Sequence, residues 1–172
     1  MAALSQLARR LVLAMLLTAA LLPDAQAQSK PGPTMGPSGL PLPRFVSLAS
    51  STVNVRTGPS TDHPIRWTYT RSGLPVRIVE EFDVWRRIED PDGETGWAHS
   101  SLLSVRRTVM VQGKGPQELR RSGDAGARVV ARVEPGAIGE FQGCEGGWCR
   151  LEVSGQRGWM PRAQLWGVGP SD

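Results

Sequence analysis

The chain has 172 residues and contains 20 glycines and 14 prolines, so about a fifth of its positions disfavour regular helix or strand interiors. This composition argues against long helices. The 20 lysines and arginines exceed the 16 aspartates and glutamates by only four, and the basic residues form no long run, which argues against a nucleic-acid-binding protein.

The N-terminus has the features of a secretory signal peptide. Arg9 and Arg10 precede an apolar run from Leu11 to Leu22, and a small-residue cleavage site ends at Ala27. The apolar run is shorter than the roughly 20 residues that cross a bilayer. We therefore expect residues 1–27 to be a cleaved signal peptide and the mature protein to be periplasmic or secreted, with no stable membrane span.

Residues 28–43 are rich in proline. This stretch has five prolines and three glycines and lacks aromatic residues, so it offers little apolar surface to bury. We interpret it as a semi-extended linker. A polyproline ligand for an aromatic groove is the alternative, but the proline spacing does not follow the usual recognition pattern.

The rest of the chain contains an internal repeat. Trp85 lies twelve residues after Gly73, and Trp148 lies twelve residues after Gly136. Two Gly-Trp pairs follow with one residue of slippage, Gly96-Trp97 and Gly158-Trp159. The repeat predicts two domains of about 60 residues, at 44–104 and 105–168.

Each repeat has the pattern of a small β structure. In the first copy, short strand-like runs separated by turn residues cover 53–56, 65–70, 76–80, 84–88 and 96–99. Asp92-Gly93 and Ser154-Gly155 mark the turn between the last two runs of each copy. We predict an all-β protein with two tandem barrels of about five strands each. We expect Trp85 and Trp148 to fill the two barrel interiors.

A longer motif in the first copy resembles the bacterial SH3-like (SH3b) domain. It comprises the run from Val53 to Ser60, followed by Gly73, Trp85, Gly96-Trp97 and Leu103. The second copy is divergent because no proline follows its Gly123. The resemblance implies two SH3-like barrels that act as binding modules. It also implies ligands such as peptidoglycan peptides or other components of the cell envelope.

The two cysteines suit an exported protein. Cys144 and Cys149 flank four residues, so a tight loop between adjacent strands would bring them within bonding range. We predict a disulfide in preference to free thiols. Two cysteines and two distant histidines do not form a zinc pattern, and the spacing is not that of a redox-catalytic pair. We therefore expect no metal and no cofactor.

The chain lacks a convincing catalytic arrangement. Asp62 and His63 are adjacent in a loop, and His99 precedes two serines, but no Gly-x-Ser-x-Gly element is present. The acidic run 80–83 is typical of a solvated strand end. We predict that the protein is not an enzyme.

The candidate ligand-binding surface lies in the first copy. Trp67 and Tyr69 alternate with polar residues and should share one strand face, and we align them with Val130 and Arg132 of the second copy. Aromatic residues kept by one copy are less needed by the shared core. The alternative is that they cover a barrel end or the contact between units. The full set of candidates is Asp62, His63, Trp67, Tyr69 and His99.

Two functions remain open. The first is an exported, non-catalytic module that recognises peptidoglycan or another envelope component. The second is a periplasmic protein–protein interaction or scaffolding module. Arg120 and Arg121 of the second copy could meet an anionic wall polymer, although a solvated surface explains them more simply.

Overall fold

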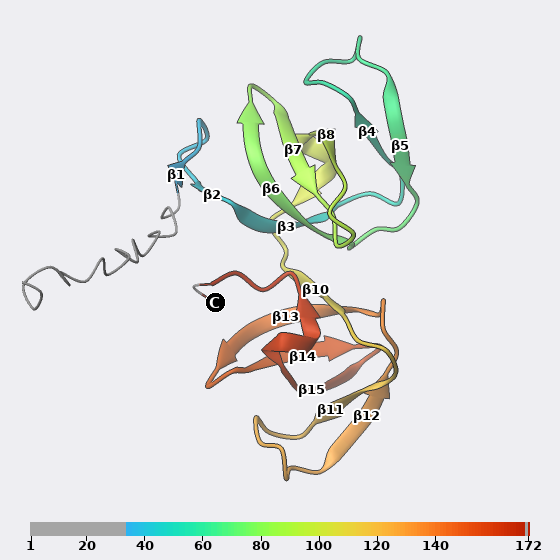
Figure 1. Cartoon of the computed structure of the whole chain (residues 1–172), viewed down its shortest axis with the longest axis vertical. Coiled ribbons are helices and arrows are strands. Elements are labelled where there is room, and N and C mark those ends of the chain that lie inside the picture. Colours follow the sequence, from blue (N-terminus) through green and yellow to red (C-terminus); the bar gives the residue numbers. More distant parts are fainter. Residues whose placement is uncertain (1–33, 171) are drawn as a thin grey trace, which may run out of the picture. The chain divides into compact units, whose positions relative to one another are not determined.

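The computed structural model describes residues 34–170 and 172. The predicted signal peptide, residues 1–27, lies outside these residues, as does the linker up to residue 33. The described part consists of strands and turns with two short 3₁₀ helices, and it forms two seven-stranded antiparallel sheets (Figure 1). No helix in this part is long and apolar enough to cross a membrane.

The first sheet has the order β5-β4-β8-β7-β6-β3-β9. Its strands are β3 (Arg44–Leu48), β4 (Val53–Arg56), β5 (Ile65–Tyr69), β6 (Pro75–Phe82), β7 (Trp85–Glu89), β8 (Thr95–His99) and β9 (Leu103–Ser104). A 3₁₀ turn, Ser100–Leu102, connects β8 to β9. The five predicted strands are all present. The sequence reasoning missed β3 and β9, which pair with each other and bring the count to seven.

The second sheet repeats this order as β12-β11-β15-β14-β13-β10-β16. Its strands are β10 (Thr108–Val111), β11 (Gln117–Arg120), β12 (Val129–Val133), β13 (Ile138–Glu145), β14 (Trp148–Val153), β15 (Gln156–Pro161) and β16 (Leu165–Trp166). The second 3₁₀ turn is Arg162–Gln164. The predicted all-β fold of two tandem SH3-like barrels is therefore confirmed.

Each barrel closes around its own aliphatic core. Val53, Val55, Val76 and Ile88 are among the fully buried residues of the first. Leu119, Leu151 and Met160 are among those of the second. Neither core contains aromatic side chains among its fully buried members, so β-branched and linear aliphatic residues supply most of the apolar burial.

The expectation that Trp85 and Trp148 fill the barrel interiors was wrong. Side chains alternate between the two faces of a strand. Ile88 points into the first core, so Trp85, three residues earlier on β7, points to the other face, with Arg87. Likewise, Leu151 points into the second core, so Trp148, three residues earlier on β14, points to the opposite face.

The glycine of each Gly-Trp pair allows two strands to cross closely. A Cβ atom on Gly96 would overlap Val55 and lie 3.1 Å from the Arg56 carbonyl oxygen. A Cβ atom on Gly158 would lie 2.6 Å from the Arg120 carbonyl oxygen. The repeated glycine is therefore required where β8 meets β4, and where β15 meets β11.

The linker departs from its predicted extended form. From Thr34 on, the chain makes a small antiparallel hairpin of β1 (Thr34–Met35) and β2 (Pro41–Leu42). The backbone N–H and the hydroxyl of Ser38 both donate to Glu81, each at 2.9 Å. The sequence interpretation considered only the small apolar surface of this segment. The structure shows that hydrogen bonds to the buried Glu81 carboxylate hold the segment on the barrel.

Candidate functional site: a groove repeated in both barrels

A groove lies on the outer face of the first barrel, where Trp85 closes one side. Its volume is about 240 Å³. The groove is bounded by β4, the loop after it, the start of β7, the end of β8 and the 3₁₀ turn. The lining residues are Asn54, Arg56, Thr61, Trp85, His99, Ser101 and Leu102.

Arg56 fixes the loop that forms one wall. Its guanidinium donates to the carbonyl oxygens of Thr61 at 2.9 Å and His63 at 2.7 Å. The His63 ring packs over Gly58, where a Cβ atom would come within 2.4 Å of it. The loop between β4 and β5 is therefore held by its own strand.

His99 lies at the opposite wall and contacts Trp85. The two rings meet edge to face with centroids 5.5 Å apart. The Nδ1 atom of His99 is 2.7 Å from the Ser101 hydroxyl and accepts from the Ser101 backbone N–H at 3.3 Å. The histidine thereby caps the 3₁₀ turn, and its ring and the Ser101 hydroxyl both line the groove.

The second barrel has a groove at the matching place. Trp148 pairs with Pro161 as Trp85 pairs with His99. Arg120 donates to the carbonyl oxygen of Ala127 at 2.7 Å, as Arg56 does in its own loop. This groove is larger, about 670 Å³. Its lining residues are Pro116, Gln117, Glu118, Arg120, Ala125, Arg132, Trp148, Pro161 and Gln164.

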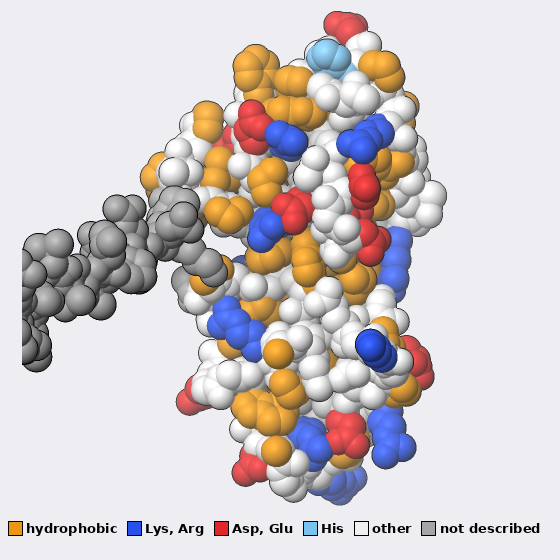
Figure 2. Space-filling model, viewed as in Figure 1, with side chains coloured by type: hydrophobic (Ala, Val, Ile, Leu, Met, Phe, Trp, Pro, Cys, Tyr) orange, Lys and Arg blue, Asp and Glu red, His pale blue; other side chains and the backbone are white. Residues whose placement is uncertain are grey.

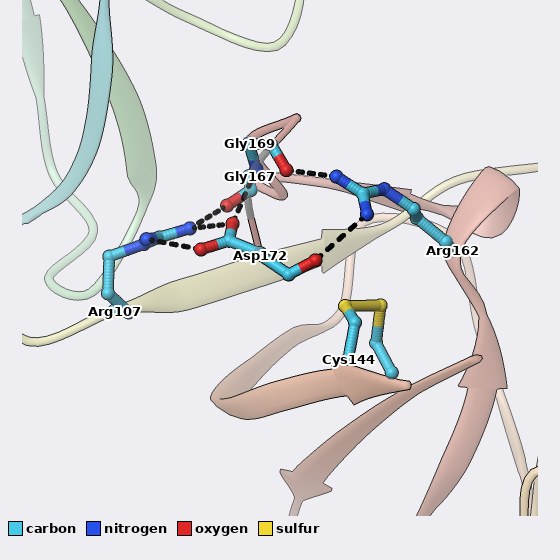
Figure 3. Close-up of a disulfide and its surroundings, with 7 residues drawn as sticks. Arg107, Cys144, Arg162, Gly167, Gly169 and Asp172 are labelled. Atoms are coloured by element: carbon cyan, nitrogen blue, oxygen red, sulfur yellow. Dashed lines mark hydrogen bonds and ion pairs between the residues drawn. A yellow bond between two sulfur atoms is a disulfide. The ribbon is translucent and has the colours of Figure 1, made fainter. Parts of the chain in front are cut away.

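Different chemistry fixes the tryptophan hairpin in the two barrels. In the second, Cys144 and Cys149 are direct cross-strand partners and form the predicted disulfide, with their Cα atoms 3.9 Å apart (Figure 3). In the first, Glu81 and Arg86 are cross-strand partners at the same offset from the turn, and their charged atoms are 3.2 Å apart. Each pair lies one position farther from the turn than the cross-strand pair that contains the groove tryptophan.

Glu81 is a buried carboxylate with several donors. Its side chain is only 1 % exposed, and it accepts from Ser38 and from Arg44 at 2.5 Å. Burial by itself raises the pKa of Glu81, but the hydrogen bonds from the Ser38 backbone, Arg44 and the Ser38 hydroxyl outweigh it and lower the pKa to about 2. Glu81 therefore stays ionised and connects the N-terminal hairpin to the Trp85 hairpin.

A second charged cluster holds the end of the second barrel. Asp172 accepts from Arg107 at 2.7 Å and from the Gly169 backbone at 2.5 Å, and its carbonyl oxygen accepts from Arg162 (Figure 3). Burial raises the pKa of Asp172, and the hydrogen bond from Arg107 leads the opposing contributions that lower it overall. This cluster joins Arg107, before the first strand of the barrel, and Arg162, after the last long strand, to the C-terminal residue.

The structure does not bring Trp67 and Tyr69 together with His99. Trp67 is opposite Val55 and Tyr69 opposite Val53 on β4, and both aromatic side chains pack against the first core. The Tyr69 hydroxyl donates to Asp90 at 2.6 Å. Burial and this bond raise the pKa of Tyr69 well above its ordinary value.

The alignment of these aromatic residues with the second barrel was off by one position. Leu119, the counterpart of Val55, is opposite Ala131, and the last register pair puts Val133 opposite Gln117. Trp67 and Tyr69 thus correspond to Ala131 and Val133, which belong to the second core or pack against it. The same bulge interrupts both strand pairs, and the one-residue difference between the copies falls after them, between Tyr69 and Gly73 in the first and between Val133 and Gly136 in the second.

Asp62 and His63 lie at the exposed tip of the loop beside Thr61. The Asp62 backbone N–H donates to the Ser60 hydroxyl at 3.0 Å, which turns the chain at the tip. Of the five predicted site residues, His99 lines the groove and these two flank it. The sequence analysis missed other lining residues of the groove, among them Asn54, Arg56, Ser101 and Trp85. For Trp85 a signal was present, because strand alternation places it on the opposite face from the core residue Ile88.

The side chains that line the first groove are mostly uncharged. The described residues contain no group of three or more His, Cys, Asp or Glu side chains placed to hold a metal ion. On the face shown in Figure 2, basic and acidic side chains are interspersed with apolar ones. What the groove offers is an indole edge, an imidazole, an amide and hydroxyls, which is an inventory for binding.

These features define a class of protein: tandem SH3-like barrels, each with a groove beside a tryptophan. The model of one family, the bacterial SH3 domain, matches residues 49–104 and again residues 113–167. The chain therefore belongs to the bacterial SH3 domain family, whose members are binding modules. No curated protein matches the chain.

The solved structures that are similar to this chain include three with NlpC names. NlpC2 and NlpC1 from Trichomonas vaginalis are 11% and 12% identical, with TM-scores of 0.33 and 0.35. An NlpC/P60 family protein from Bacillus cereus ATCC 10987 is 12% identical, with a TM-score of 0.32. They cover 72%, 80% and 71% of this chain, which spans 48%, 47% and 55% of theirs.

Proposed function

We propose that this protein is an exported, non-catalytic binding module that recognises peptidoglycan or another cell-envelope component through the groove beside Trp85. The observation that carries the proposal is the position of the repeated tryptophan. The same residue in both copies lines an outer groove instead of filling a core. Neither tryptophan belongs to the core cluster of its barrel, although Trp85 itself is buried.

The chemistry of the first groove suits an uncharged or weakly charged polar polymer. Asn54, His99 and Ser101 supply hydrogen-bonding groups, and Trp85, 8 % exposed, supplies a firm apolar edge. Arg56, the one lining residue with a fixed charge, is engaged with loop carbonyls. The groove can therefore bind and orient a ligand but lacks an activated nucleophile.

Two features support export. Residues 1–27 have the pattern of a signal peptide, and the Cys144–Cys149 disulfide suits an oxidising compartment such as the periplasm. The experiment is a pull-down of the mature chain with purified sacculi at low salt. Retention that falls several-fold in both Asn54→Ala and His99→Ala, measured at a temperature at which circular dichroism shows each variant folded, is expected. Retention of neither the wild type nor the variants would overturn the proposal.

One observation favours a protein partner as the second candidate. Phe82 and Val84, next to Trp85 in the β6–β7 turn, are 58 % and 41 % exposed. Exposed apolar side chains beside a groove are typical of protein contacts. Affinity capture from an envelope extract separates the two functions. One stoichiometric protein that is lost with Phe82→Ser, without retention on sacculi, would favour the interaction module.

A further inference from the structure

The second barrel carries a groove of its own with a different lining. It is larger than the first, and five of its residues decide its character: Glu118, Arg120, Arg132, Trp148 and Pro161. Trp148 is half-buried and Pro161 replaces His99, so the apolar part of the groove is more open. The imidazole that marks the first groove is absent from the lining of the second.

The two arginines of this groove differ in how strongly other groups of the chain bind them. Arg120 is held by the Ala127 carbonyl oxygen and by Glu118. Arg132 is 74 % exposed at its side chain, and its Nη2 atom is 3.8 Å from Glu118. Within the described part of the chain, the guanidinium of Arg132 makes no hydrogen bond. One cation at the groove therefore remains largely free for a ligand.

This cation is specific to the second groove. Arg132 is opposite Glu118 on β11, and the matching position on β5 is Thr68, opposite Asn54. Thr68 donates its hydroxyl to Asn54 at 2.8 Å. The first groove therefore ends in a closed neutral pair, whereas the second ends in an accessible guanidinium.

We propose that the second groove is a separate binding site for a short peptide segment that carries a carboxylate. Trp148 and Pro161 would contact the apolar part of the peptide, and Arg132 would pair with the carboxylate. The charge complementarity favours an anion, because Glu118 already neutralises Arg120 and the positive charge of Arg132 remains uncompensated. The site does not depend on the proposed function of the first groove.

The test uses the mature full-length chain labelled with ¹⁵N and three acetylated pentapeptides of alanine and proline. One carries a single glutamate and an amidated C-terminus, the second has glutamine in its place, and the third has glutamine and a free C-terminus. The Trp148 indole signal, assigned with Trp148→Phe, reports binding. Comparing the first and third peptides distinguishes a side-chain carboxylate from a terminal one.

We expect at least one carboxylate peptide to bind about fivefold more tightly than the neutral peptide, and the difference to fade at high salt. Arg132→Gln should abolish this preference. Arg157→Gln, which removes the same charge from the β14–β15 hairpin, is the matched control and should keep the preference. Equal binding of all three peptides, or equal effects of the two variants, would overturn the proposal, whatever the sacculus experiment gives.

Discussion

Glu81 is the residue on which three segments of the first barrel converge. It accepts hydrogen bonds from Ser38 in the N-terminal hairpin and pairs with Arg44 on β3 and Arg86 on β7. Burying a carboxylate is costly unless such partners compensate it. The residue therefore makes the first barrel sensitive to acid in a predictable way.

The folded-state pKa of Glu81, about 2, lies below its ordinary value of 4.5. The stabilisation is fully present above the ordinary value and is lost as the pH falls from about 4.5 towards 2. The shift corresponds to roughly 3 kcal/mol at neutral pH. We predict that the free energy of unfolding falls over this range, measured by urea denaturation at a series of pH values.

Glu81→Gln provides the matched comparison, because glutamine does not titrate. This variant should be less stable at pH 7 and should show a flatter pH profile in the acidic range. Asp172 also has a lowered pKa and contributes its own acid dependence in both proteins. A profile unchanged by Glu81→Gln would show that Glu81 is not the responsible group.

Trp67 has a structural role on this account. Its ring packs against the first core, and its Nε1 atom is buried without a hydrogen-bond partner among the described residues. We predict that Trp67→Ala lowers the free energy of unfolding by about 2–4 kcal/mol, while the folded protein still binds sacculi. Loss of retention with an unchanged thermal transition would restore the ligand-facing interpretation of Trp67 and Tyr69.

At the scale of elements, the tryptophan hairpins β6–β7 and β13–β14 are built alike but secured differently. The ion pair of Glu81 and Arg86 and the disulfide of Cys144 and Cys149 occupy matching cross-strand positions. A reductant should therefore loosen the second groove and spare the first. In each hairpin, the cross-strand ion pair or disulfide holds the two strands together next to the groove tryptophan and so fixes the position of its side chain.

We predict that the Cys144→Ala, Cys149→Ala double variant destabilises the second barrel by about 2 kcal/mol or more. The short loop limits the entropic contribution of the disulfide, and the loss of packing at the core residue Cys149 adds to it. Amide hydrogen exchange resolves the two barrels. Faster exchange should be confined to 108–166. An equal acceleration of exchange in β3 to β9 would contradict the claim that the disulfide stabilises only the second barrel.

The close crossing of β11 and β15 gives another element-scale prediction. Gly158→Ala would drive a Cβ atom to 2.6 Å from a backbone oxygen, which a side chain cannot relieve, so we expect a loss of about 2–4 kcal/mol. Gly115→Ala meets no atom within 4 Å and should be nearly neutral. Thermal denaturation of the two variants compares them directly, and similar midpoints would show that the crossing is not tight.

Local signals determined which elements could be predicted. The strands next to the Gly-Trp pairs and the turns at Asp92-Gly93 and Ser154-Gly155 follow from alternation and turn chemistry, and the structure has them. Strands β3 and β9 pair across more than 50 residues, and the β1–β2 hairpin depends on Glu81, so neither has a local signal. The outward direction of Trp85 was available from its spacing to Ile88.

At the scale of the whole molecule, duplication has produced two barrels with one strand order and two different grooves. The first includes His99 and has Arg56 as its one fixed charge, whereas the second has Glu118, Arg120 and the exposed Arg132. A chain with two unlike sites can bind two parts of one polymer, or a polymer and a protein, more tightly than either site alone. The individual residues of the grooves, more than the fold, decide the ligand.

The most direct test of the central claim follows the indole N–H signals of Trp85 and Trp67 while soluble glycan–peptide fragments, released from sacculi by a muramidase, are titrated into the ¹⁵N-labelled mature chain. We predict saturable shifts of the Trp85 indole and of the His99 and Ser101 amides, with the Trp67 indole unmoved. Shifts centred on Trp67 and Tyr69, or no shift in any first-barrel residue, would contradict it.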